Sequence, residues 1–187
     1  MAERRRFAGR PEKTAHKLSS KIILEAALSI ARNEGVEAIS FRRLSQDLKV
    51  TAMAVSYHVG GRHKMLTDLV ALAFRGLVGD HIEEKPEANL RRLLSDYCHR
   101  ALQYSSLVRA MLVDPSLMSS DIKALTQEIR ENTRRLNNGD EGDVLLNLLV
   151  DYTHGFVFAA AAAPREQSPA DEEFLRSLDW VLAKAAP

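Results

Sequence analysis

Apolar residues recur at helical spacing along most of this chain of 187 residues. In the clearest case they fall one turn apart between residues 20 and 34, and Gly35 follows as the expected helix stop. Further segments begin at Ser, Thr or Pro and end near Gly, Asn or Pro. We predict helices over residues 20–34, 40–48, 52–58, 62–79, 86–104, 120–137, 144–163 and 174–185, with a short helix before Asp114-Pro115. This pattern predicts an all-α fold.

Composition is typical of a soluble globular protein of one or two domains. Hydrophobic residues make up 45% of the chain and charged residues 27%, which is an ordinary balance for such proteins. The single cysteine, Cys98, cannot form an internal disulfide and offers no cysteine-rich metal site. The basic N-terminus lacks the apolar run of a signal peptide. We expect a cytoplasmic protein without a metal or another cofactor.

Charge is distributed unevenly along the chain. Residues 1–64 contain 13 Lys and Arg against 6 Asp and Glu, a net charge of +7, whereas residues 65–187 contain 13 against 19, a net charge of −6. A small basic part joined to an acidic part indicates that only the first part meets a polyanion. Within the basic part, residues 1–18 offer few core-forming side chains, so we expect a flexible basic arm.

The segment 144–163 is apolar on nearly every side. Its length is close to the roughly 20 residues that span a bilayer, but Asn147, Asp151 and His154 interrupt it. An Asp near the centre of a membrane helix costs about 2.5 to 3.5 kcal/mol. We therefore predict a helix buried by its own domain on one side and by a partner chain on the other.

In the terminal segment, Trp180 lies away from the main apolar stripe. It is a candidate interface anchor, and a partly exposed or locally packed side chain is the alternative.

The segment 40–66, SFRRLSQDLKVTAMAVSYHVGGRHKML, has the spacing of a helix-turn-helix unit. Ser40 and Thr51 can cap its two helices, and Gly60-Gly61 ends the second. In such a unit the second helix enters the major groove of DNA, while neighbouring polar and basic groups bind phosphates. The segment therefore predicts DNA binding.

The same segment resembles the Tet repressor (TetR) family of transcriptional regulators. The family pattern is a small polar cap, a basic residue, leucine, a turn, valine, a short helix, an aromatic residue, histidine, an aromatic residue or valine, and a basic residue before leucine. The corresponding residues are Ser40, Arg42, Leu44, Leu48, Val50, Thr51, Tyr57, His58, Val59, Arg62 and Leu66. The resemblance implies a three-helix N-terminal DNA-binding domain and a larger helical domain whose last two helices pair with those of a second subunit. We divide the chain into a basic arm (1–18), a helix-turn-helix domain (19–64) and a ligand-binding and dimerisation domain (65–187).

Two positions depart from the family pattern. Lys49 stands where the family usually has glycine, and a left-handed turn costs a residue other than glycine about 1 to 2 kcal/mol. Ser56 stands where the family has a tyrosine that often contacts phosphate. These departures motivate an alternative function, that of a helical small-molecule-binding or interaction protein without specific DNA recognition.

Roles in DNA binding follow from the chemistry of the side chains. Arg42 suits bidentate recognition of a guanine edge, with a plain surface arginine as the alternative. Apolar surface for thymine methyl groups comes from Ala52, Met53 and Ala54. The residues placed for phosphate contacts are Thr51, Ser56, Tyr57, His58, Arg62 and Lys64. In the arm, Gly9-Arg10-Pro11 resembles the core of peptides that bind the minor groove, and a tail with only nonspecific attraction to DNA is the alternative.

The resemblance also implies a small-molecule effector that changes the spacing of two DNA-binding heads. Such a ligand acts only if it binds one arrangement of the dimer more tightly than the other. Our candidate pocket residues place polar tips, sulfur or aromatic rings among apolar helices, with plain core as the alternative for each. They are Tyr97, Tyr104, Met111, Met118, His154 and Phe158.

These observations predict a homodimeric, ligand-responsive transcriptional regulator, by resemblance a repressor, that binds a palindromic DNA operator. We do not expect an enzyme. Asp96, Cys98 and His99 point apart on a helix and form no nucleophile-base pair, and His154 alone is no metal site. The chain also has no Gly-rich phosphate loop, HExxH or paired-cysteine motif.

Overall fold

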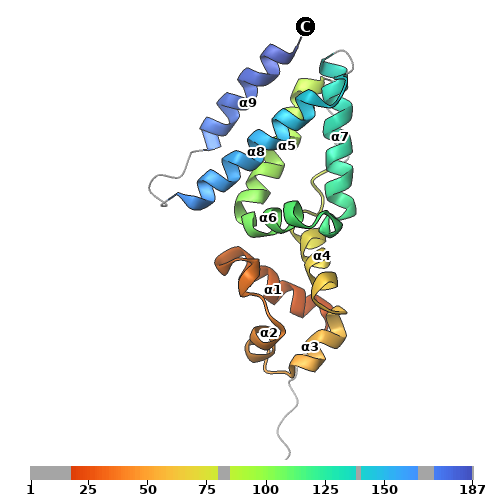
Figure 1. Ribbon diagram of the computed structural model, residues 1–187, viewed down its shortest axis with the longest axis vertical. Helices are drawn as coiled ribbons and strands as arrows, with labels where there is room; N and C mark the ends of the chain where they lie inside the picture. Colours follow the sequence, from red (N-terminus) through yellow and green to blue (C-terminus); the bar gives the residue numbers. More distant parts are fainter. Residues whose placement is uncertain (1–17, 80–84, 138–139, 164–170, 187) are drawn as a thin grey trace, which may run out of the picture.

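The computed structural model describes residues 18–79, 85–137, 140–163 and 171–186. In these ranges every regular element is a helix and no strand occurs, so the predicted all-α fold is confirmed. Figure 1 shows a small helical unit below and a larger one above, with α4 (Arg62–Ala73) running between them. The basic arm predicted at 1–18, including Gly9-Arg10-Pro11, lies outside the described residues except for Leu18.

The small unit begins with helices at the predicted positions. Its elements are α1 Ser20–Glu34, the 3₁₀ turn η1 Val36–Ala38, α2 Phe41–Asp47 and α3 Ala52–Val59. Both predicted caps are confirmed. The Ser40 hydroxyl accepts a hydrogen bond from the Arg43 N–H at 3.1 Å. The Thr51 hydroxyl accepts one from the Ala54 N–H at 3.1 Å.

The apolar faces of these helices meet in one core. Ile23, Leu44 and Val55, one from each α-helix, are fully buried, and Met65 of α4 (Arg62–Ala73) joins them. The end of α3 depends on Gly60, which adopts a φ of 71°. A Cβ there would lie 2.9 Å from Cδ of Lys64, so glycine suits both the backbone and the space.

The end of α4 corrects the sequence prediction, because the helix stops at Ala73 and not at Gly79. The apolar spacing does continue, since Phe74 is fully buried, but this side chain packs from a turn in which Gly76 has a φ of 74°. A tertiary contact satisfies the helix end: the Arg100 guanidinium donates to the Ala73 carbonyl at 2.7 Å. This contact comes from a distant helix and leaves no local signal in the sequence.

The larger unit is built around α5. Its elements are α5 Pro86–Gln103, α6 Ser105–Val113, the 3₁₀ turn η2 Pro115–Leu117, α7 Ser120–Leu136, α8 Val144–Ala162 and α9 Asp171–Ala185. α5 contacts α7, α8 and α9, and its residues Leu90, Leu93 and Leu94 are fully buried. Asp140, just before α8, accepts the N–H groups of Leu145 and Leu146 in the first turn of this helix with its carboxylate.

α8 has two different faces. By length and composition alone it could cross a membrane, but it packs against α5, α7 and α9, and its residues Leu149, Thr153 and Val157 are buried. It is therefore a core helix of this unit. The opposite face is exposed and consists of Val144, Leu148, Asp151, Gly155, Ala159 and Ala162, which we call the α8 stripe. These residues recur at intervals of three or four, so they form one continuous line along the helix.

Candidate DNA-binding surface and ligand pocket

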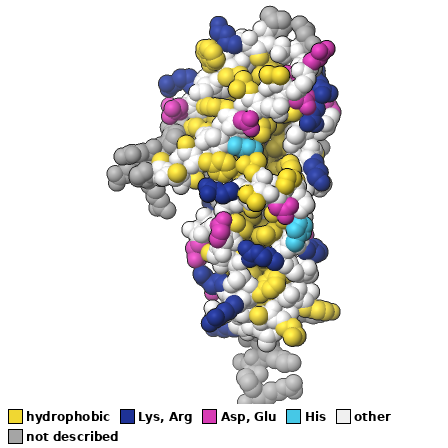
Figure 2. All heavy atoms as spheres, in the orientation of Figure 1, with side chains coloured by type: hydrophobic (Ala, Val, Ile, Leu, Met, Phe, Trp, Pro, Cys, Tyr) yellow, Lys and Arg dark blue, Asp and Glu magenta, His cyan; other side chains and the backbone are white. Residues whose placement is uncertain are grey.

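α3 presents two large side chains to solvent at the far end of the small unit. Met53 is 83% exposed and Tyr57 is 85% exposed, and they lie one turn apart. Figure 2 shows hydrophobic side chains protruding at the lower end of the molecule, where Figure 1 places α3. Side chains exposed to this extent contribute little to the core, so they are free to contact another molecule.

The turn between α2 and α3 keeps a left-handed residue despite the departure from glycine. Lys49 has a φ of 54°. The Val50 N–H still donates to the Ser45 carbonyl at 3.0 Å, and the Lys49 N–H donates to the Gln46 carbonyl at 3.3 Å. Lys49 therefore adopts the left-handed conformation at a cost of about 1 to 2 kcal/mol in folding free energy. The turn between the two helices keeps its hydrogen bonds.

Two neighbouring arginines of α2 differ in how they are bound. The Arg43 guanidinium is held by Glu34 at 2.9 and 3.1 Å and by Asp47 at 2.9 Å. Arg42 is exposed, and within the described part of the chain its guanidinium has no hydrogen-bond partner. Arg42 is therefore free to bind an external acceptor, as its predicted base-reading role requires, whereas Arg43 is engaged within the small unit.

The predicted phosphate-binding residues surround α3, but several have internal partners. Arg62 donates to the Ile39 carbonyl at 2.7 Å, Lys64 pairs with Asp68 at 2.7 Å, and the Thr51 hydroxyl caps α3. Each of these partners restrains the conformation of its side chain. All three residues remain exposed, so their side chains are still accessible to another molecule. Among the other predicted residues, Ala52 and His58 are exposed, and Ala54 and Ser56 are half-buried.

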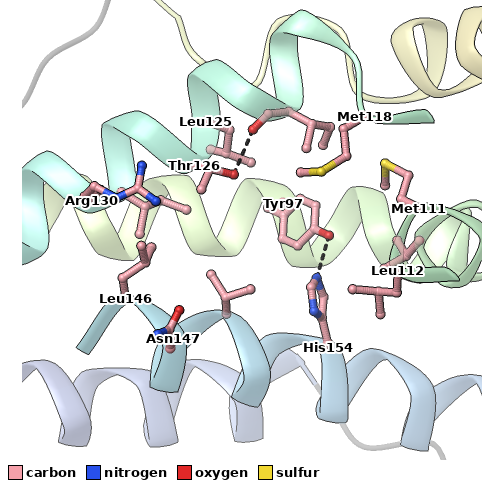
Figure 3. Close-up of a pocket in the computed structure, with 14 residues that line it drawn as sticks. Tyr97, Met111, Leu112, Met118, Leu125, Thr126, Arg130, Leu146, Asn147 and His154 are labelled. Atoms are coloured by element: carbon pink, nitrogen blue, oxygen red, sulfur yellow. Dashed lines mark hydrogen bonds between the residues drawn. The ribbon is translucent and has the colours of Figure 1, made fainter. Parts of the chain in front are cut away.

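A cavity of about 230 Å³ lies in the larger unit between α5, α6, α7 and α8 (Figure 3). Four of the six candidate pocket residues line it, namely Tyr97, Met111, Met118 and His154. Most of the remaining lining is aliphatic. In the described part of the chain, no cluster of His, Cys, Asp and Glu is suited to hold a metal ion.

Tyr104 and Phe158 do not line this cavity. Tyr104 follows the last residue of α5 with a φ of −131°. Its side chain is buried where the chain turns into α6. Phe158 lies one turn beyond His154 on α8, where the Arg109 guanidinium sits 5.4 Å from its ring centre. Phe158 lies on the predicted helix, where its ring contacts Arg109, whereas Tyr104 lies just past the end of α5 and not within it as predicted.

Tyr97 and His154 form a hydrogen-bonded pair inside the cavity. The Tyr97 hydroxyl and Nε2 of His154 are 2.9 Å apart, and the two residues come from facing helices (Figure 3). Burial raises the pKa of Tyr97 well above its ordinary value and lowers the pKa of His154 below 6.5. Both side chains are therefore uncharged at neutral pH.

The sequence pattern did not single out three other polar residues of the cavity lining. These are Thr126, Arg130 and Asn147. Thr126 and Arg130 follow Ile122, another lining residue, at intervals of four, which places all three on one side of α7. That shared spacing is the signal that could have identified Arg130 as a pocket residue.

Arg130 belongs to a small ionic cluster. Its Nε donates to Asp143 at 2.9 Å and one terminal nitrogen donates to Gln127 at 2.9 Å. Arg134 binds the other oxygen of Asp143 at 3.0 Å. The hydrogen bond from Arg130 is the main cause that lowers the pKa of Asp143, so this carboxylate is ionised at neutral pH.

α6 connects the cavity to the small unit. Near its start, the Ser106 hydroxyl accepts a hydrogen bond from the Val36 N–H at 3.0 Å. Beyond its end, the Ser116 hydroxyl lies 2.8 Å from Nε2 of His63 on α4. Between these two contacts, α6 contributes Met111 to the cavity lining. A shift of α6 would therefore move both contacts with the small unit.

Comparison with known proteins places the chain by its fold. No protein-family model matches the chain, and no curated protein matches its sequence. BioQ of Mycobacterium smegmatis aligns with a TM-score of 0.74 at 18% identity, over 91% of this chain and 98% of that chain. BioQ bound to its double-stranded DNA operator gives 0.70 at 20% identity, over 89% and 99%.

A third similar structure is the TetR family protein ActR of Streptomyces coelicolor in complex with (S)-DNPA. It aligns with a TM-score of 0.63 at 19% identity, over 90% of this chain and 99% of that chain. At these identities the comparisons establish the architecture. The chain has the fold of TetR-family proteins along nearly its whole length, which confirms the resemblance at the level of the fold.

Proposed function

We propose that this protein is a cytoplasmic, homodimeric repressor of transcription that binds a palindromic DNA operator and responds to a small molecule. In this proposal residues 19–64 form the DNA-binding domain and residues 65–187 the ligand-binding and dimerisation domain. The observation that carries the proposal is α3, which presents Met53 and Tyr57 to solvent, together with the exposed Arg42 of α2, for which the described residues provide no hydrogen-bond partner.

DNA binding is supported by chemistry and by fold. Arg42 can offer two donors to a guanine edge, Met53 can contact a thymine methyl group, and Tyr57 and His58 can reach phosphates. BioQ, which shares this fold, has been solved with its double-stranded DNA operator. A helix-turn-helix head with preserved turn geometry provides the same opportunity in this chain.

Dimerisation is supported by the α8 stripe. Three of its residues, Gly155, Ala159 and Ala162, are small, so a second helix can approach closely along this part of α8. Leu148 is 54% exposed, and Trp180 on neighbouring α9 is 63% exposed. We propose that α8 and α9 pack against the same helices of a second subunit in a four-helix bundle. The two α3 helices would then face successive major grooves about 34 to 36 Å apart.

Ligand response is supported by the position of α6. The cavity lies against this helix, which is hydrogen-bonded to the small unit near its start through Ser106, and η2 directly after it is hydrogen-bonded to His63 of α4 through Ser116. A molecule that fits one position of α6 better than another would change the distance between the two DNA-binding heads. ActR, which shares the fold, was solved in complex with the small molecule (S)-DNPA.

DNA binding is tested with the two neighbouring arginines of α2. A cognate duplex is first selected from genomic fragments, and fluorescence anisotropy then measures the affinity of each variant for this duplex and for a random one. Arg42→Ala should weaken cognate binding by about 1 to 3 kcal/mol and leave random binding nearly unchanged. Arg43→Ala removes the same charge from an internally bound side chain and should lose less. Equal losses of Arg42→Ala on both duplexes would contradict a base-reading role.

Dimerisation is tested by adding a charge to the α8 stripe. Leu148→Asp places a carboxylate in the proposed interface and should make the protein monomeric in sedimentation velocity at micromolar concentration. Val113→Asp is the matched control, because Val113 is 82% exposed on α6 and lies away from the stripe. This control should remain dimeric. A wild-type monomer that still binds its duplex with full affinity would contradict the bundle.

A further inference from the structure

The two ends of the cavity differ in charge. At one end, close to α6, the Tyr97–His154 pair lies beside Met111 and Met118 (Figure 3). At the other end, where α7 and the start of α8 meet, Arg130 and Asn147 reach the lining. The rest of the lining is mainly aliphatic and includes Leu125, Ile129, Leu146 and Val150; the Thr126 hydroxyl is also in the lining and donates to the Ile122 carbonyl at 3.0 Å. A ligand in this cavity therefore meets two unlike polar regions within a mostly apolar lining.

The end near α6 offers hydrogen bonds without charge. Tyr97 and His154 are both neutral because burial disfavours their ionised forms. The tautomer of His154 sets whether the Tyr97 hydroxyl donates to Nε2 or accepts from it, and in either case the hydroxyl can form a further hydrogen bond to a ligand. A carbonyl or hydroxyl group, or plain hydrocarbon, suits this end, whereas an ion would lose its hydration without gaining an opposite charge.

The end at α7 contains the charged side chain of the lining. Among the described residues that line the cavity, Arg130 carries a charge, whereas its partner Asp143, which it shares with Arg134, does not line the cavity. The carboxylate of Asp140 accepts two N–H groups at the start of α8 and does not line the cavity either. Among the described residues, one terminal nitrogen of Arg130 has no hydrogen-bond partner, and Asn147 lines the same end of the cavity from α8 (Figure 3).

The size of the cavity limits the ligand. An apolar cavity of about 150 Å³ can hold benzene, and this one measures about 230 Å³ and opens toward solvent. It therefore suits a molecule larger than benzene, with the slender shape that the separation of the two polar ends requires.

From this arrangement we propose that the cavity binds a slender, mostly apolar monocarboxylic acid, with its carboxylate on Arg130 and Asn147 and its apolar end toward Tyr97 and His154. The inference deepens the proposed function, because it takes the cavity to be the effector site. A carboxylate suits Arg130 better than a neutral group does, since charge-assisted hydrogen bonds to a guanidinium are the stronger kind. A cationic ligand is disfavoured by the same charge.

The test uses three probes of equal chain length that differ only in the head group: decanoate, decan-1-ol and decylamine. Isothermal titration calorimetry on the full-length protein should show that decanoate binds most tightly and decylamine least. Arg130→Gln should weaken decanoate binding about tenfold and leave decan-1-ol binding within about twofold. Arg134→Gln is the matched control, because it removes a guanidinium from the same carboxylate but does not line the cavity. It should weaken decanoate binding much less.

The inference is overturned if decanoate binds no better than decan-1-ol, if decylamine binds best, or if Arg130→Gln and Arg134→Gln have equal effects. It is also overturned if none of hexanoate, octanoate, decanoate and 4-butylbenzoate binds at millimolar concentration. Circular dichroism of both variants separates lost binding from lost folding. Because calorimetry uses protein without DNA, its outcome is independent of operator binding. If decanoate binds as expected but leaves the anisotropy of the protein–DNA complex unchanged, the ligand class stands and the regulatory coupling fails.

Discussion

The DNA-binding surface and the ligand cavity relate to the protein core in opposite ways. On α3, the side chains with proposed contacts point outward, as the 83% exposure of Met53 and the 85% exposure of Tyr57 show. In the cavity, the lining residues Tyr97, Met111 and Ile129 are also core residues with exposures of 7%, 5% and 2%. Binding and stability are therefore separable on α3 and coupled in the cavity.

This difference has a consequence for how each site can change. A substitution on the outer face of α3 alters contacts with a partner while the packing of Val55 and Val59 beneath it stays intact. A substitution in the cavity changes the shape of the site and the packing of the larger unit together. The operator preference of such a fold can therefore vary at less cost in stability than its ligand preference.

The largest expected effect tests this separation directly. Ile129→Ala should lower the free energy of unfolding by at least about 2 kcal/mol, because it deletes buried methyl groups and enlarges the cavity. Met53→Ala should change it by less than about 0.5 kcal/mol while weakening DNA binding. Urea unfolding followed by circular dichroism, at one fixed protein concentration, gives both values. A similar loss of stability in both variants would break the comparison.

A smaller effect concerns pH and the neutral state of His154. Burial lowers its pKa below 6.5, so over part of the acidic range the unfolded chain binds a proton that the folded protein does not. The stability that the neutral imidazole supplies is complete above pH 6.5 and is lost as the pH falls through the folded-state pKa. His154→Gln should reduce this dependence. Urea unfolding of both proteins across the acidic range measures it, and identical slopes would contradict the account.

The smallest effect sharpens the comparison within the small unit. Lys49 has a φ of 54°, so Lys49→Gly should relieve about 1 to 2 kcal/mol of strain and add about 0.5 to 1 kcal/mol of backbone entropy cost. A net gain of roughly 0.5 kcal/mol is expected in thermal unfolding. Lys49→Ala keeps the strain and should show no gain. Equal stability of the two variants would show that the turn is not strained.

Local signals made most of the fold predictable. Caps at Ser40 and Thr51, the stop at Gly60 and the proline at the start of α5 are short-range features that act within one helical turn. The end of α4 could not be predicted, because buried Phe74 continues the apolar spacing while Arg100, from another helix, closes the helix end.

The sites were predictable to different degrees for the same reason. The helix-turn-helix segment is contiguous in sequence, so its motif and the direction of α3 follow from local spacing. The cavity is assembled from four helices, and only packing decides that Arg130 reaches it while Tyr104 does not. Residue chemistry identified Tyr97 and His154 as candidates, but their hydrogen bond depends on the docking of α8 against α5.

The most direct test of the central claim, that two copies of α3 bind one duplex together, varies the distance between half-sites. Anisotropy titrations compare the selected palindromic duplex with one that carries about five additional base pairs between its halves, which is half a helical turn. Two chains should bind the first duplex together, and the affinity for the second duplex should fall to that of an isolated half-site. Unchanged affinity for the lengthened duplex would show that the two copies of α3 do not bind together.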